Sequence, residues 1–126
     1  MFSAKKSTIL VIDSNKSILR VFRHILEKNG YQVATAETGK EAAQKLHCSG
    51  FDAALMDLEL PDIEGTDLLS HLKKTNPEMV KIIFGDLPKL EKSIDEEGCD
   101  RVFVEKPIPP ENLLTILDAK LQKTKL

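Results

Sequence analysis

The sequence has few of the residues that cross-link small domains. It contains two cysteines and no tryptophan among 126 residues, and aromatic residues make up 5% of the chain. Cys48 and Cys99 belong to no C-x-x-C or His/Cys cluster, so we expect two reduced, half-buried thiols rather than a disulfide or a metal site. A chain of this length forms a hydrophobic core without such links, and we expect one domain spanning residues 1–126.

A large charge of one sign is also missing. Eighteen Lys and Arg residues against twenty Asp and Glu residues give a formal net charge of −2, with both signs mixed along the chain. This pattern argues against a large nucleic-acid-binding surface. No apolar run approaches the roughly 18 to 20 residues that cross a bilayer, and the N-terminal residues lack the apolar core of a signal peptide. We therefore expect a cytoplasmic protein that does not bind membranes.

Short apolar runs alternate with amphipathic segments along the whole chain. The runs are rich in β-branched residues and apolar at nearly every position, as in strands buried on both faces of a parallel sheet. The predicted strands are residues 8–12, 31–36, 51–56, 79–84 and 101–104. The first predicted helix follows a cap at residue 14 or 15 and ends at residues 29 and 30, and the others are residues 40–48, 66–74, 89–97 and 110–123.

Capping residues and apolar positions support these helices. Ser14 or Asn15 caps the first helix, which ends at Asn29 and Gly30, where glycine suits the left-handed conformation. The inward positions follow the helical period. They are Ile18, Val21, Phe22, Ile25 and Leu26 in the first helix, and Ala42, Ala43 and Leu46 in the second.

Alternation of five strands with five helices predicts an α/β fold. The expected architecture is a doubly wound, five-stranded parallel sheet of flavodoxin-like type, with strand order 2-1-3-4-5 and helices on both faces. In such folds the functional site lies at the carboxyl ends of the strands, beside the switch in strand order. The residues that follow each strand are therefore the candidate site residues.

Three of these residues carry complementary charges. Asp13, Asp57 and Lys106 follow the first, third and fifth predicted strands and converge at one edge of the sheet in this fold. Taken singly, an aspartate at a strand end is more often a turn former, and a lysine before proline is more often a solvated loop residue. Two carboxylates with a backbone carbonyl suit Mg²⁺, however, and a carboxylate beside a metal and an ammonium can attack phosphorus.

The chain resembles the response-regulator receiver domains of two-component signalling over essentially its whole length. The motifs that carry the resemblance are ILVIDSNKSILR, GYQVATAETGKEA, LMDLELPDIEG and EEGCDRVFVEKPIPPENLL. The resemblance implies that Asp57 is the phosphoacceptor and that Lys106 contacts the phosphoryl group. It further implies that Asp13, Asp57 and the backbone carbonyl of Glu59 bind Mg²⁺, and that the aromatic side chain of Phe103 reports activation.

Three positions depart from the pattern of the family. Ser14 replaces the second acidic residue that ligates Mg²⁺, which predicts weaker metal binding. Gly85 replaces the Thr or Ser whose hydroxyl bonds the phosphoryl group and carries the signal. Asp86 stands where a small neutral residue is usual, and its carboxylate either repels the phosphoryl group or serves as a substitute metal ligand. The side chain of Glu59 is a second candidate substitute, although an exposed loop glutamate is the more ordinary interpretation.

These features leave two main hypotheses about function. The first is a receiver of a phosphorelay that accepts a phosphoryl group on Asp57, with self-catalysed transfer and hydrolysis as its only enzymatic activity. The second is a pseudo-receiver that binds proteins without phosphorylation. A flavodoxin-like cofactor enzyme ranks far below both, because DSNKS after the first strand supplies no glycine for a phosphate loop.

The resemblance also implies the partners of the chain. A sensor histidine kinase or a phosphotransfer protein supplies the phosphoryl group. A downstream protein binds the predicted helices 89–97 and 110–123 together with strand 101–104. Since no output domain is expected after the last helix, we expect the chain to act by docking or to be part of a longer protein.

Overall fold

The fold is a single parallel sheet between two layers of helices. The computed structural model describes residues 7–57, 59–63, 65–85, 101–105 and 109–124. Its strands are β1 (Thr8–Ile12), β2 (Gln32–Ala36), β3 (Ala53–Asp57), β4 (Val80–Gly85) and β5 (Arg101–Glu105). Its helices are α1 (Lys16–Lys28), α2 (Gly39–Cys48), α3 (Gly65–Thr75) and α5 (Pro110–Thr124). The predicted helix 89–97 lies outside the described residues.

The strand order is β2-β1-β3-β4-β5, and every neighbouring pair is parallel. This order confirms the doubly wound sheet expected from the sequence. Parallel pairing of neighbouring strands requires connections that return the chain to the same end of the sheet. Within the described residues, no helix has the length and apolar character needed to cross a membrane.

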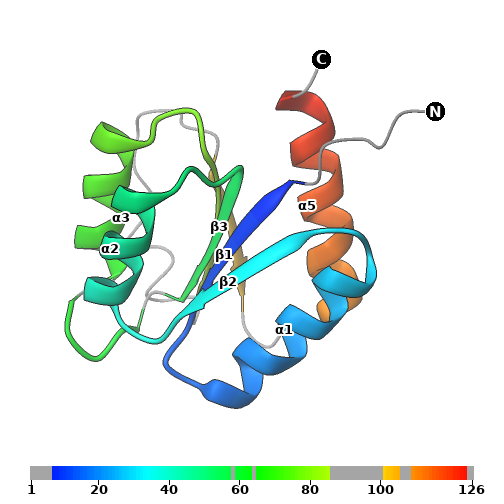
Figure 1. Ribbon diagram of the computed structural model, residues 1–126, viewed down its shortest axis with the longest axis horizontal. Helices are drawn as coiled ribbons and strands as arrows, with labels where there is room; N and C mark the ends of the chain where they lie inside the picture. The colour runs from blue at the N-terminus through cyan, green and yellow to red at the C-terminus, as the bar shows by residue number, and fades with distance from the viewer. Residues whose placement is uncertain (1–6, 58, 64, 86–100, 106–108, 125–126) are drawn as a thin grey trace.

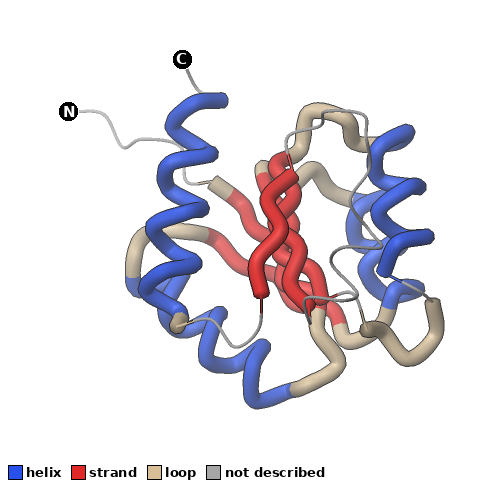
Figure 2. The backbone as a smooth tube through the Cα atoms, turned by 180° about the vertical axis from the view of Figure 1, so that it is seen from behind, coloured by secondary structure: helices blue, strands red, loops and turns tan. Residues whose placement is uncertain are grey.

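Helices α2 and α3 cover one face of the sheet, and α1 and α5 cover the other (Figure 1). Figure 2 shows the strands enclosed between these two layers. Successive residues of β1 alternate between them: Leu10 and Ile12 belong to the core beneath α2 and α3, whereas Ile9 and Val11 belong to the core beneath α1 and α5. Because both faces are covered, β3 and β4 are buried at every position, which explains their unbroken apolar runs.

Helix α1 begins and ends at the residues that its sequence indicates. Of the two candidate caps, Asn15 performs the role: its side-chain oxygen accepts hydrogen bonds from the backbone N–H groups of Ser17 at 2.9 Å and Ile18 at 3.3 Å. At the other end, Gly30 has a φ of 94°, the left-handed conformation that favours glycine. Ser14 is therefore not needed to start the helix.

Two details of the sequence interpretation are wrong. Val21 was expected on the buried stripe of α1 but is 48% exposed, and Leu19 takes its place in the core. The apolar surface of α1 is wider than the area that the sheet and α5 cover, so periodicity alone does not identify the buried edge. Cys48 is an exposed free thiol rather than a half-buried one, while Cys99 lies outside the described residues.

Candidate functional site

Two buried aspartates lie next to each other where β1 and β3 end. Ile12 of β1 pairs with Met56 of β3, so the next residues along the two strands are Asp13 and Asp57. Asp57 is itself the last residue of β3, and the backbone N–H of Asp13 donates to the carbonyl oxygen of Ala36 at 3.0 Å. The two side chains are 1% and 5% exposed. Two carboxylates buried side by side repel each other, which favours a cation between or beside them.

Both carboxylates form the same local turn. Oδ1 of Asp13 accepts a hydrogen bond from the N–H of Asn15 at 2.8 Å, and Oδ1 of Asp57 accepts one from the N–H of Glu59 at 2.9 Å. Such bonds to the residue two positions ahead are characteristic of aspartate at the end of a strand. They fix each carboxylate relative to its own loop, so the turn-forming and chemical interpretations of these residues are compatible.

Two residues that follow these aspartates closely in the sequence are more accessible. The side chains of Ser14 and Glu59 are exposed. Across the part of the chain that is described, no group of three or more His, Cys, Asp and Glu side chains is arranged to hold a metal ion. Two carboxylates and a backbone carbonyl nevertheless fit Mg²⁺, since this ion keeps several of its waters and uses few protein ligands.

Strands β4 and β5 bring two further sequence positions toward the same edge. Asp57 pairs with Phe84, and the following residue, Gly85, is the buried last residue of β4. Gly85 in turn pairs with Glu105, the last residue of β5. The backbone of Phe103 lies in β5 opposite Ile83, whereas its side chain, Asp86 and Lys106 lie outside what the structure describes.

The loop after β3 also contacts the start of α2. The carboxylate of Asp62 accepts hydrogen bonds from the backbone N–H groups of Gly39 and Lys40. These two bonds hold the pKa of the Asp62 carboxyl below its ordinary value, because they favour the charged form. Sequence reasoning did not identify this contact, since no periodicity relates residues so far apart.

Comparison with known proteins gives the family. The profile described as "Response regulator receiver domain" matches residues 9–118, which is most of the chain. The chain belongs to the response regulator receiver domain family. As such it is a component of two-component signal transduction.

Solved structures of other receiver domains share the fold. A CheY-like receiver domain protein from Methanospirillum hungatei has a TM-score of 0.85 and 33% identity, over 96% of this chain and 98% of that one. A BeF3-activated DrrB receiver domain has a TM-score of 0.81 and 29% identity, over 94% and 99% of the two chains.

The curated relatives are longer proteins. This receiver domain is 33% identical over 112 residues to the alginate biosynthesis transcriptional regulatory protein AlgB of Pseudomonas aeruginosa. The match covers 88% of this chain and 25% of AlgB. It is 29% identical to the two-component response regulator ARR11 of Arabidopsis thaliana, and that match covers 97% of this chain and 24% of ARR11. The chain thus spans about a quarter of the length of these two proteins.

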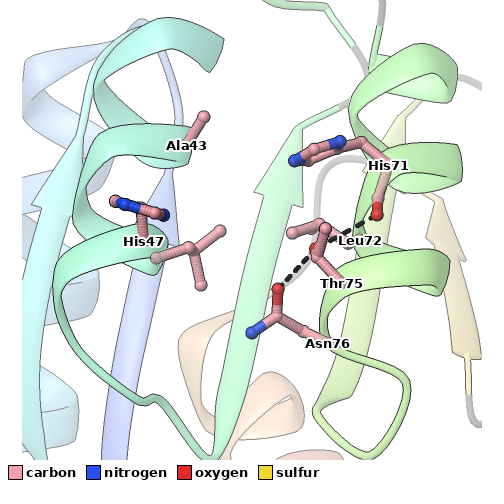
Figure 3. Close-up of a pocket in the computed structure, with 7 residues that line it drawn as sticks. Ala43, His47, His71, Leu72, Thr75 and Asn76 are labelled. Atoms are coloured by element: carbon pink, nitrogen blue, oxygen red, sulfur yellow. Dashed lines mark hydrogen bonds between the residues drawn. The ribbon is translucent and has the colours of Figure 1, made fainter.

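Two surface cavities of the receiver domain lie on the α2 side of the sheet. One, of about 190 Å³, lies between α2 and α3 and is lined by His47 and His71 among others; in Figure 3 the ring of His71 extends from α3 toward α2. The other, of about 290 Å³, is lined by Ala34 of β2 and by residues of α2 and the segment that follows it, including Cys48. Neither is lined by Asp13, Asp57 or Gly85, and nothing in the sequence pattern relates the two histidines.

Proposed function

We propose that Asp57 accepts a phosphoryl group from a phosphohistidine of a sensor kinase or a phosphotransfer protein. The observation that carries this proposal is the pair of buried carboxylates, Asp13 and Asp57, at adjacent carboxyl ends of β1 and β3. A turn former at a strand end does not need burial, whereas an acceptor that reacts beside a cation gains from exclusion of bulk water. The family match and the sheet both support a single receiver domain over residues 1–126.

In the proposed reaction, a carboxylate oxygen of Asp57 attacks the phosphorus atom. The new P–O bond forms as the P–N bond to the histidine breaks, and the leaving imidazole nitrogen keeps the electron pair of that bond and takes up a proton. The hydrogen bond from the N–H of Glu59 to Oδ1 of Asp57 orients the nucleophile. Lys106, directly after β5 in the sequence, is proposed to contact the phosphoryl oxygens.

Receiver domains typically bind Mg²⁺, and the donors available here fit it. Asp13, Asp57 and the backbone carbonyl of Glu59 would hold the ion, which when bound neutralises charge on the transferring group. Ser14 offers a neutral hydroxyl where a carboxylate is usual, so we propose weaker metal binding than in relatives with two acidic residues. The side chains of Asp86 and Glu59 are the candidate compensating ligands.

The test is the intact mass of the protein after incubation with acetyl phosphate and Mg²⁺. We expect the mass of one phosphoryl group on the wild type and none on Asp57→Asn, in which the nucleophile is replaced by an amide of the same shape. An equal gain in the two proteins would show that the acceptor is another residue.

Gly85 supports a second candidate function, the phosphorylation-independent pseudo-receiver. This residue ends β4 next to the strand that carries Asp57, and it has no side-chain hydroxyl that can bond a phosphoryl group. In that case the proposed partner surface, α5 and β5 together with the helix predicted at residues 89–97, binds its downstream protein regardless of phosphorylation. Equal affinity of that partner for wild type and Asp57→Asn under phosphorylating conditions would favour this alternative.

A further inference from the structure

The carboxylate of Asp62, in the loop after β3, accepts two hydrogen bonds from the first turn of α2. Oδ1 of Asp62 accepts from the N–H of Gly39 at 2.8 Å, and Oδ2 accepts from the N–H of Lys40 at 2.9 Å. The helix's own cap, Thr38, uses its hydroxyl oxygen to accept from the N–H of Glu41 at 3.0 Å. Donors of the first turn have no partner inside the helix, so Asp62 satisfies two that Thr38 does not reach.

An apolar contact lies at the same place. A Cβ atom added to Gly39 would lie 1.9 Å from Cγ2 of Ile63, far inside van der Waals contact, and 3.3 Å from Cβ of the same residue. Ile63 is half-buried and packs against the core beneath α2 and α3. The loop and the helix therefore approach so closely that any larger residue at position 39 would have to displace the side chain of Ile63. Two independent contacts, one polar and one steric, fix the loop at residues 62 and 63.

The near end of the same loop is fixed by the acceptor residue itself. Glu59 donates its N–H to Asp57, and Asp62 is the third residue after Glu59. Three residues span at most about 10 Å, so the two attachments restrict where the carbonyl of Glu59 can lie. The hydrogen bonds of Asp62 therefore connect the loop that contains this carbonyl to α2, although neither Asp13 nor Asp57 lies in α2.

We infer that Asp62 is a positioning residue for the acceptor site, acting through the loop that carries Glu59. The inference rests on the proposed function, because the carbonyl of Glu59 matters as a proposed ligand of Mg²⁺. Without the hydrogen bonds of Asp62 to α2, binding of Mg²⁺ would have to order the loop. The free-energy cost of that ordering would lower the affinity for the ion. Phosphorylation of Asp57 would then slow at limiting Mg²⁺ and recover when Mg²⁺ is saturating.

The test compares Asp62→Ala with wild type in two measurements. Calorimetric titration of the unphosphorylated proteins gives the dissociation constant for Mg²⁺, which we expect to rise about tenfold, as is common for groups that orient metal ligands. The rate of mass gain with acetyl phosphate, followed at increasing Mg²⁺, gives the recovery at saturation. Asp62→Asn keeps one of the two acceptor oxygens and should fall between the two proteins.

Two further variants separate positioning from stability. Gly39→Ala improves the helix propensity of residue 39 but displaces Ile63, so it should weaken Mg²⁺ binding without loosening α2. Asp52→Ala is the matched control: Asp52 is another exposed carboxylate that accepts a backbone N–H, from Thr8 at 2.8 Å, but at the opposite end of the sheet. It should leave Mg²⁺ binding unchanged.

Equal Mg²⁺ affinity of wild type, Asp62→Ala and Gly39→Ala would overturn the inference, as would a wild type that binds no Mg²⁺. An equal loss of affinity in Asp52→Ala would also overturn it, since charge alone would then explain the effect. Failure of the proposed function looks different: the wild type would bind Mg²⁺ more tightly than Asp62→Ala, yet gain no mass.

Discussion

At the scale of single residues, the structure decides between two roles of Ser14 that the sequence could not separate. The sequence left open whether Ser14 or Asn15 caps α1, and a capping role would have explained Ser14 without any reference to metal. The cap is Asn15, and Ser14 is exposed between it and the buried Asp13. A substitution at residue 14 therefore tests the proposed metal site without removing the helix cap.

Ser14→Asp should bind Mg²⁺ roughly tenfold more tightly than wild type, a difference of about 1.4 kcal/mol, because a charged oxygen ligand replaces a neutral one. The chain has no tryptophan, so calorimetry or NMR titration is the suitable measurement. Ser17→Asp adds the same charge on an exposed position of the first turn of α1 and serves as control. An equal gain in both variants would mean that the effect is long-range charge and not ligation.

Tyr31 is the second residue whose environment yields a measurable property. Its hydroxyl donates to Oδ1 of Asp118 and so joins the start of β2 to α5. Burial, together with the hydrogen bond and the negative charge of Asp118, raises the pKa of the Tyr31 phenol above its ordinary value. The unfolded chain therefore loses this proton first, and the contribution of Tyr31 to stability is complete below about pH 10 and declines as the pH rises further.

Tyr31→Phe should lower the free energy of unfolding by about 1 kcal/mol at neutral pH, since Asp118 loses its donor. The difference from wild type should shrink above pH 10. Tyr31 is the one tyrosine of the sequence, so the ultraviolet absorbance of the phenolate titrates it directly in the folded protein and in urea. Identical titration midpoints in the two states would rule out this linkage.

At the scale of elements, the edge strand β2 is protected by two cations. Gln32 and Ala36 hydrogen-bond toward β1, so the carbonyls of Val33 and Thr35 face away from the sheet. Arg23 of α1 donates to the carbonyl of Val33 at 3.2 Å, and Lys45 of α2 donates to that of Thr35. Charged side chains on an edge strand prevent pairing with another chain.

The double variant Arg23→Ala with Lys45→Ala should self-associate in a concentration-dependent way, since both outward carbonyls become available for strand pairing. Sedimentation velocity at increasing protein concentration measures this directly. The matched control is Arg20→Ala with Lys40→Ala, which removes the same charges from exposed positions of the same helices. If the two double variants self-associate to the same extent, Arg23 and Lys45 do not prevent pairing at the edge strand β2.

At the scale of the whole molecule, the sequence predicted the features that depend on which residues are buried. It did not predict contacts that depend on how closely two segments of the backbone approach each other. Apolar runs such as that of β1 indicated the strands, and residues such as Asn15 and Gly30 indicated where a helix begins and ends. The alternation of these elements predicted the strand order and the two layers of helices. The hydrogen bonds between Asp62 and α2 could not be predicted in this way, because they depend on how closely the backbone at Gly39 approaches the loop. The sequence predicted that Asp13, Asp57 and Gly85 lie at one edge of the sheet, and the structure brings them together there. The chemical roles of these three residues stay predictions, as do those of Lys106, Asp86 and the Phe103 side chain.

The final prediction concerns which parts of the protein change conformation when a phosphoryl mimic binds at Asp57. A ligand shifts a conformational equilibrium only through contacts that differ between the two states. In the usual receiver that contact is a side-chain hydroxyl at the end of β4, and Gly85 offers only its backbone N–H, which is present in both states. Beryllium fluoride at Asp57 should therefore change NMR chemical shifts mainly around residues 13, 57, 85 and 106, with small changes at Phe103 and along α5.

Gly85→Thr should enlarge the response at Phe103 and α5, because it places a hydroxyl at the end of β4, next to the strand that carries Asp57. Gly85→Ala is the matched control, since it adds the Cβ atom without the hydroxyl, and spectra of both variants without beryllium fluoride report whether the strand end accepts a side chain. If the wild-type protein already shifts at α5 as strongly as Gly85→Thr, the signal does not need the hydroxyl. The switch would then act through Asp86 or through the backbone of β4 and β5, which is paired between Gly85 and Glu105.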